Sequence, residues 1–303
     1  MKFAAISIDG RYRHALVHED LLHPLPAGTD LFPVLTAPPD QVLARCEKPV
    51  APQRLLPPVR PPSIRDFITF EKHMEGAGRG LGRDGVLPEW YEIPTFYFTN
   101  PHALIGATDP VPVPPGCQVF DFELEVAAII GTEGGNLTVE DAAEHIAGYS
   151  VFNDWSARDL QAHEMRIGLG PAKGKDTAST LGPYLVTPDE LEPYRDGDRY
   201  DLTMTVSINE TELGTDSLAN MAWSFPELIA YASRGTVVRP GDVLGSGTCG
   251  DGCLVEFWGR RGAQDPPPLK VGDTVTMSVT GLGTISNTVI EGQPVHPVAR
   301  ARS

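Results

Sequence analysis

The chain has 303 residues, of which 21% are charged and 41% are hydrophobic, and its formal net charge is −16. These proportions are typical of a folded protein with one large domain or two unequal ones. The acidic balance argues against nucleic acid and against an anionic membrane as partners, because both attract basic surfaces, whereas clustered acids can hold a divalent cation.

The N-terminal segment predicts a β-hairpin, because apolar runs at residues 2–8 and 11–18 flank the turn pair Asp9-Gly10. Its first apolar run is too short for a secretory signal, and charged residues follow at once. The sequence also has no apolar run of membrane-spanning length. With four cysteines and these features, we expect a cytoplasmic protein whose thiols are free.

Proline is concentrated between residues 38 and 62, which predicts an extended connector rather than a packed element. We therefore expect a small N-terminal domain with this connector over residues 1–58. The main, catalytic domain is then expected over residues 59–303.

Helical spacing of apolar residues follows the connector. It predicts a helix over residues 63–74, with Ser63 as its candidate N-cap. Glycines crowd the next stretch, from Glu75 to Gly85. Because such a segment loses much conformational entropy when it is ordered, it predicts either a disordered linker or a mobile lid.

Strands are predicted to dominate the rest of the chain. The segments with strand-like composition are PTFYF, EVAAII, YSVF, LGPYLVT, LTMTVSIN, CLVEFW and TVTMSVTGLGTISNTVI. Short helices are predicted at VEDAAEHIA, SARDLQAHEM and SFPELIAYAS. The strands do not alternate regularly with helices, and the abundant Gly (31) and Pro (29) favour turns. The sequence therefore predicts a β-rich α+β fold rather than a doubly wound one.

Two glycine motifs and one cysteine pair match known binding motifs only in part. GSGTCG, at residues 245–250, fits a dinucleotide-binding pattern, but a strand is predicted after it where that pattern needs a helix. GPAKGKD, at residues 170–176, has a glycine spacing one residue short of a phosphate loop. Cys249 and Cys253 supply half of a zinc site, but no second Cys or His pair is near them in the sequence. We therefore do not expect zinc at this cysteine pair.

The segment FDFELEVAAIIG, residues 120–131, carries acids into an apolar strand. Residues two apart share a strand face, so Asp121, Glu123 and Glu125 are predicted to project the same way. A single E-x-E most often lies on the solvent-exposed face of a half-buried strand. The apolar continuation VAAII, however, predicts burial on both faces. Carboxylates at that position need a compensating charge, such as a cation.

A second polar group lies in GYSVFNDWSARDLQ, residues 148–161. Asp154 is placed where a strand gives way to a helix that Ser156 could cap. Arg158 and Gln161 are three residues apart and share one face of that helix. Taken alone, Asp154 is most often a turn residue and Arg158 a surface ion pair. Together they place an acid, a cation and an amide at one strand end, which suits a carbonyl or carboxylate substrate.

Several motifs, in order over residues 60–290, resemble the fumarylacetoacetate hydrolase family. They are DFELEVAAIIG, GYSVFNDWSARDLQ, GPAKGKDTASTLGPYLVTPDEL, RPGDVLGSGTCGDGC and GDTVTMSVTGLGTISN. The resemblance implies a mixed β-sandwich or β-roll catalytic domain with a small N-terminal domain, assembled as a homodimer. It also implies a divalent metal ion, commonly Mg²⁺, Mn²⁺ or Ca²⁺.

The resemblance further implies the metal ligands. Glu123, Glu125 and Asp154 match the family's ligands, and Asp66 matches a further acid of the longer members. All four offer oxygen, which suits a hard cation and argues against zinc or copper.

The groups implied for catalysis come from other segments. His73 matches the general base of the longer members, and Glu256 matches the carboxylate that orients it. The groups that would hold substrate oxygens are Arg158, Gln161, Lys175 and Thr248. Taken alone, His73 and Lys175 are most often solvated surface residues.

From this resemblance we expect a metal-dependent hydrolase that cleaves a C–C bond in a small 2,4-dioxo acid, using water activated by His73 and a metal-stabilised enolate. Ile68 and Ala178-Ser179 depart from the family's motifs, which argues against fumarylacetoacetate itself as the substrate. The alternatives are an isomerase, an oxaloacetate-type decarboxylase or a sugar-acid dehydratase with the same metal. A metal-binding protein without turnover is a further alternative.

Overall fold

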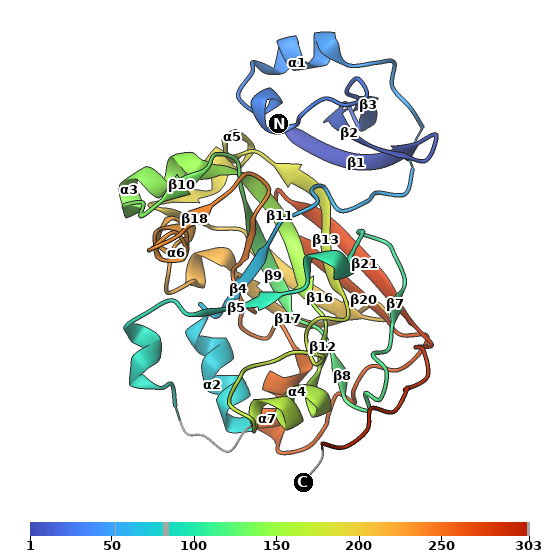
Figure 1. Ribbon diagram of the computed structural model, residues 1–303, viewed down its shortest axis with the longest axis vertical. Coiled ribbons are helices and arrows are strands. Elements are labelled where there is room, and N and C mark those ends of the chain that lie inside the picture. The colour runs from blue at the N-terminus through green and yellow to red at the C-terminus, as the bar shows by residue number, and fades with distance from the viewer. Residues whose placement is uncertain (52, 81–84, 302–303) are drawn as a thin grey trace.

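A computed structural model describes residues 1–51, 53–80 and 85–301, and it is built on two main β-sheets with short helices around them (Figure 1). The predicted β-rich α+β fold is confirmed. Every helix in the described part of the chain is too short or too polar to cross a membrane.

The larger sheet has 10 strands and holds the centre of the molecule. Its strands, in spatial order, are β3 (Leu21–Pro24), β2 (Arg11–His18), β1 (Lys2–Ile8), β13 (Ser179–Val186), β11 (Ile146–Asp154), β9 (Leu124–Ile130), β19 (Val243–Gly245), β4 (Ile64–Phe67) and β5 (Phe96–Thr99), with β6 (Leu104–Ile105) beside β13. All seven residues of β9 are buried. Val126 and Ala128 pack in one core cluster and Ala127 and Ile129 in another, which confirms the predicted burial of this strand on both faces.

The smaller sheet has 5 strands and packs against the larger one. Its strands, in order, are β17 (Thr211–Ser217), β16 (Thr203–Ile208), β20 (Thr274–Val279), β21 (Gly283–Ile290) and β7 (Val111–Pro112). Along β20 the buried residues alternate with hydroxyl residues, so that Val275, Met277 and Val279 enter the core. This alternation agrees with the strand predicted for the segment and gives it one buried face.

Short ribbons and helices connect and cover the sheets. The ribbons pair β8 (Phe120–Asp121) with β12 (Ser156–Ala157), β10 (Gly134–Gly135) with β18 (Val237–Val238), and β14 (Arg195–Asp196) with β15 (Arg199–Tyr200). The α-helices are α1 (Pro39–Arg45), α2 (Glu71–Gly80), α3 (Val139–Ala142), α4 (Arg158–Met165), α5 (Pro188–Leu191), α6 (Phe225–Ala232) and α7 (Leu254–Arg261).

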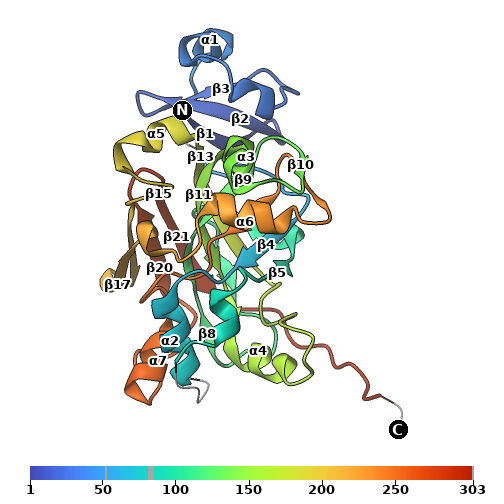
Figure 2. The same cartoon turned by 90° about the vertical axis from the view of Figure 1, so that its left-hand side faces the viewer.

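The predicted N-terminal hairpin is confirmed, with β1 and β2 joined by the turn at Asp9 and Gly10. Strand β1 also pairs with β13, through Lys2 and Val186, so the hairpin extends the larger sheet. Figures 1 and 2 place the hairpin and α1 at the end of the molecule opposite to α2, α4 and α7. A domain boundary at residue 58 remains a proposal.

The predicted helix over residues 63–74 is wrong in its first half. Residues 64–67 form β4, which pairs in parallel with β19 and is buried along its whole length. Tertiary burial overrides the local helical spacing there. Ser63 does not cap a helix, because its hydroxyl donates to Asp242 at 2.8 Å. The glycine-rich stretch is helical through Gly80 in α2, and its residues 81–84 lie outside the described residues.

The predicted strand CLVEFW is also wrong, because residues 254–261 form helix α7. Its buried apolar residues are Leu254, Phe257 and Trp258, at helical spacing, and Gly262 ends it with a left-handed φ of 68°. A helix therefore does follow GSGTCG, where the sequence predicted a strand. The segment still does not form a dinucleotide-binding site, because its flanking strands β19 and β20 belong to different sheets and form no βαβ unit.

Candidate active site and metal centre

Four acids are buried on or beside three strands of the larger sheet, β4, β9 and β11. Asp66 lies on β4, Glu123 directly precedes β9, Glu125 lies on β9, and Asp154 ends β11; each is at most 5% exposed. Carboxylate oxygens of Asp66, Glu123 and Glu125 lie within 4.8 Å of one another. We call these four residues the acid cluster. It unites three segments that are far apart in the sequence.

Two buried cations contact the acid cluster. The Lys175 ammonium donates to Asp154 Oδ2 at 2.7 Å and also to Glu123 Oε2. The Arg158 guanidinium lies 2.8 Å from Glu123 Oε1. Burial raises the pKa of Glu123, but the charges on Lys175 and Arg158 outweigh it and lower the pKa to about 2. Glu123 is therefore ionised at neutral pH. His73 is a further, smaller cause of this lowered pKa.

The other acids are less well compensated. Burial and the charge of Asp66 raise the pKa of Glu125 well above its usual range. Burial also raises the pKa of Asp66 and of Asp154. Within the acid cluster, three buried carboxylate oxygens have no hydrogen-bond partner among the described residues: Asp66 Oδ1, Glu125 Oε1 and Asp154 Oδ1. Each such atom costs about 1–3 kcal/mol. A hard divalent cation fits this donor set, because it would neutralise charge and bind the free oxygens.

The glycine motif before α7 supports the acid cluster. A Cβ on Gly245 would lie 3.0 Å from Glu125 Oε2 and closer still to Asp66, so only glycine leaves space for both carboxylates. Gly247 has a φ of +78° and donates its N–H to Glu125 Oε2 at 3.1 Å. The motif therefore brings backbone close to carboxylates rather than to a pyrophosphate.

A second buried group, which we call the His–Cys–Glu cluster, lies between α2 and α7. It consists of His73, Cys253 and Glu256. His73 Nδ1 lies 2.9 Å from Glu256 Oε1, and Glu256 Oε2 accepts the N–H of Asp251 at 2.9 Å. A carboxylate at Nδ1 favours the tautomer with a proton on Nδ1, which leaves the lone pair of Nε2 free to act as a base.

Packing of two helices positions this pair. A Cβ on Gly76 would lie 2.9 Å from Glu256 Cγ, so glycine at this position lets α2 approach α7 closely. Figures 1 and 2 both show the two helices side by side. One glycine of the predicted linker or lid, Gly76, thus serves in a helix contact.

Arg158 and Gln161, two of the predicted substrate-binding residues, contact each other. Arg158 donates to Gln161 Oε1 at 3.2 Å on one face of α4, as their spacing predicted. Thr248 is buried in the loop between β19 and α7. Ser156 does not cap α4; it belongs to β12, and its hydroxyl donates to the carbonyl of Asp154. The N-cap position belongs to Ala157.

Asp121 lies outside the acid cluster but shares Arg158 with Glu123. The strand is interrupted between β8 and β9, so the predicted continuous alternation fails there. Asp121 accepts the N–H groups of Leu254 and Val255 at the start of α7, and the Arg158 guanidinium donates to it at 2.9 Å. Arg158 therefore links the first turn of α7 to the acid cluster.

Sequence reasoning missed two site residues. The Tyr97 hydroxyl, on β5, donates to Asp154 Oδ2. Burial and the charge of Asp154 raise the pKa of Tyr97 well above its usual range, so it is a neutral donor. The alternation in PTFYF, which places Tyr97 opposite its phenylalanine neighbours, was the available signal. Cys253 was weighed only with Cys249, whereas the structure places its thiol beside His73.

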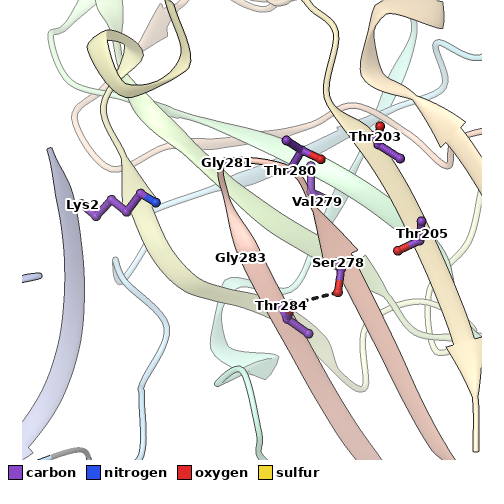
Figure 3. A pocket seen from close by; sticks show the side chains of 9 residues that line it. All are labelled: Lys2, Thr203, Thr205, Ser278, Val279, Thr280, Gly281, Gly283 and Thr284. Carbon is purple, nitrogen blue, oxygen red and sulfur yellow. Dashed lines mark hydrogen bonds between the residues drawn. The ribbon is translucent and has the colours of Figure 1, made fainter. Parts of the chain in front are cut away.

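A cavity of about 330 Å³ lies away from both clusters (Figure 3). Lys2 of β1 faces hydroxyl side chains of the smaller sheet across it, and Ser278 and Thr284 are hydrogen-bonded at 2.8 Å on its floor. None of its lining residues belongs to the acid cluster or the His–Cys–Glu cluster.

Comparison with known proteins gives the same family along most of the chain. Residues 64–290 match the family profile described as fumarylacetoacetate (FAA) hydrolase C-terminal. Fumarylacetoacetase from Oryza sativa subsp. japonica is 28% identical over 82% of this chain and 73% of its own length. Oxaloacetate tautomerase YisK from Bacillus subtilis is 30% identical over 78% of this chain and 73% of its own length. A solved fumarylacetoacetate hydrolase from Exiguobacterium antarcticum is 26% identical, with a TM-score of 0.74 over 96% of this chain and 99% of that one.

Proposed function

The chain belongs to the fumarylacetoacetate hydrolase family, and from this premise we propose that it is a metal-dependent hydrolase that cleaves a C–C bond in a small 2,4-dioxo acid. The observation that carries the proposal is the presence in one fold of a buried His73–Glu256 pair and of buried carboxylates whose oxygens lack partners among the described residues. A base and an electrophilic centre are the two requirements of such a hydrolysis.

Asp66, Glu123, Glu125 and Asp154 would hold a hard divalent ion, Mg²⁺ or Mn²⁺. When bound, such an ion supplies Lewis-acid chemistry, which polarises a carbonyl oxygen of the substrate. The short contacts of Lys175 and Arg158 with Glu123 fix this carboxylate in its ionised form. The same two cations would stabilise a negatively charged substrate oxygen.

His73 would take a proton from water at Nε2, while Glu256 stabilises the imidazolium through Nδ1. The hydroxide adds to a carbonyl carbon, the adjacent C–C bond breaks, and the leaving carbon receives a proton. The 2.9 Å contact between Glu256 Oε2 and the N–H of Asp251 holds the carboxylate in place during these steps.

A second function has its own support. A relative that is 30% identical over 78% of this chain is named as an oxaloacetate tautomerase. Interconversion of keto and enol forms needs proton transfer beside a polarised carbonyl but no attack by water. The neutral Tyr97 hydroxyl at Asp154 is a candidate proton donor for that reaction.

A panel of acylpyruvates, fumarylacetoacetate and oxaloacetate tests the proposal. Each compound is incubated with Mg²⁺ or Mn²⁺, with and without chelator, and the products are identified by NMR. Metal-dependent release of two carboxylic fragments from a dioxo acid supports the hydrolase. Accelerated keto–enol exchange without cleavage supports the tautomerase, and binding without any conversion overturns both.

A further inference from the structure

We propose that the His–Cys–Glu cluster is a second metal site, selective for a borderline-soft divalent cation such as Zn²⁺, and that its occupation withdraws His73 from use as a base. This site is separate from the acid cluster and uses a different donor set. Three kinds of ligand atom, a ring nitrogen, a thiol sulfur and a carboxylate oxygen, converge there from α2 and the N-terminus of α7.

The distances fit tetrahedral zinc. Cys253 Sγ lies 3.7 Å from His73 Nδ1 and 3.4 Å from Glu256 Oε1, and His73 Nδ1 lies 2.9 Å from the same oxygen. With Zn–S near ~2.3 Å and Zn–N or Zn–O near ~2.0 Å, tetrahedral edges are ~3.5 Å to sulfur and ~3.3 Å between nitrogen and oxygen. Two edges therefore match within about 0.2 Å. The third edge, between His73 Nδ1 and Glu256 Oε1, is shorter because a hydrogen bond joins these two atoms in the metal-free protein.

The donor types give the selectivity. The acid cluster offers only oxygen, which suits Mg²⁺ or Mn²⁺, whereas sulfur and imidazole favour zinc over magnesium. All three side chains of the His–Cys–Glu cluster are at most 5% exposed, so few adjustments are open to them. Three protein ligands leave the fourth position of a zinc ion to water or a small anion.

The surroundings hold the ligands in place. Glu256 also accepts the N–H of Asp251, and Arg260 lies 3.5 Å from it. Such partners orient metal ligands and are worth about 10–100-fold in affinity elsewhere. Cys253 occupies the N-cap position of α7, and burial together with the charge of Glu256 raises the pKa of its thiol well above the usual range, so without a metal the sulfur is protonated.

Binding changes the protonation of both groups. The Cys253 thiol gives up its proton to solvent as the sulfur–zinc bond forms. On neutral His73 the proton at Nδ1 is displaced and Nε2 becomes the protonated nitrogen. The lone pair needed to accept a proton from water is then lost, and Glu256 no longer orients the ring. This inhibitory consequence depends on the proposed hydrolysis, whereas the metal binding does not.

Cobalt(II) is the probe for binding, because a thiolate–cobalt bond absorbs in the near ultraviolet. Metal-free protein is saturated with Mg²⁺ and then titrated with Co²⁺, and afterwards with Zn²⁺. We expect one equivalent of Co²⁺ with thiolate charge-transfer absorption, displaced by Zn²⁺. Cys253→Ser should remove the absorption and weaken zinc binding at least about tenfold.

Cys249→Ser is the matched control, because Cys249 is equally buried and four residues away but lies outside the cluster. It should keep the cobalt absorption. Thermal melting of both variants, and of Cys253→Ala, checks that they are folded. Equal zinc affinity in folded wild-type and Cys253 variants, or cobalt binding without thiolate absorption, would overturn the site.

The activity arm separates the two proposals. If a dioxo acid is cleaved, micromolar Zn²⁺ should inhibit the wild-type protein in the presence of Mg²⁺, and Cys253→Ser should resist inhibition relative to its own zinc-free rate. If no dioxo acid is cleaved but the thiolate absorption appears, the zinc site stands and the hydrolase proposal fails. Inhibition of equal strength in both proteins contradicts a role for this site in inhibition.

Discussion

The two buried clusters use ionisable groups in different ways. In the acid cluster, carboxylates from β4, β11 and the start of β9 are buried together, and three of their oxygens have no hydrogen-bond partner among the described residues. In the His–Cys–Glu cluster, two helices bring unlike groups together, and both oxygens of Glu256 accept hydrogen bonds. Burial of the acid cluster costs free energy when no cation is bound. In the His–Cys–Glu cluster, both oxygens of Glu256 already have hydrogen-bond partners in the protein. The contrast is between buried carboxylates that lack compensating partners and a histidine–glutamate pair whose hydrogen bonds are made.

The largest expected effect tests the role of the second cluster as a base. His73→Ala should lower the rate of dioxo-acid cleavage by about 10²–10⁴-fold, because positioned general bases contribute rate factors of that size. Steady-state kinetics measures the loss, and calorimetry measures Mn²⁺ affinity, which should stay within a few fold because His73 is not among the acids. His18→Ala, on the N-terminal hairpin, is the control. An unchanged rate would refute the assignment of His73.

Glu125→Gln tests the acid cluster. Burial and the charge of Asp66 hold the pKa of Glu125 high, so a neutral amide resembles its form in the metal-free protein. We expect melting of the metal-free variant close to that of the wild type. Mn²⁺ affinity should fall by about 10–100-fold or more, because changes to metal-supporting groups cost that much. A large loss of metal-free stability together with normal Mn²⁺ binding would be the opposite pattern.

Glu256→Gln sharpens the comparison from the other side. Its carboxylate accepts hydrogen bonds from His73 and from the N–H of Asp251, so one amide end would face a donor. We expect the variant to lose about 1–2 kcal/mol of unfolding free energy even without metal. Urea denaturation of metal-free protein measures it. The loss of unfolding free energy should be larger than in Glu125→Gln. Equal losses in the two variants would contradict the distinction between the clusters.

The smallest effect concerns a carboxylate outside both clusters. Asp109 accepts from Arg54 and from the N–H of Gly106. Burial opposes ionisation, but these bonds lower the pKa of Asp109 below its usual range. A lowered pKa stabilises the fold above the unfolded-state value of about 4 and loses that contribution as pH falls further.

Asp109→Asn should therefore cost about 1 kcal/mol at neutral pH, and the difference from wild type should shrink below about pH 4. Urea denaturation at several pH values checks the trend. Because Asp109 lies outside the acid cluster, Mn²⁺ affinity should not change. A pH-independent difference would mean that the ion pair is not its source.

Much of the fold was predictable from local patterns. The turn at Asp9-Gly10 and the alternation along β20 specify their strands, because strand side chains alternate between faces. The continuous apolar run of β9 correctly predicted burial on both faces. In contrast, β4 and α7 were assigned to the wrong type of element. Short apolar runs fit either period, and the partners that decide between them are distant in sequence.

The sequence by itself determined the kinds of group available: oxygen-rich acids near strand ends, a histidine, and a glutamate in an apolar segment. Their assignment to a site came from resemblance to a family rather than from spacing. Only the tertiary structure decided which groups meet, such as Tyr97 with Asp154 and Cys253 with His73. The physical reason is range, since periodicity fixes the face on which a side chain lies, whereas packing of sheets and helices fixes its neighbours.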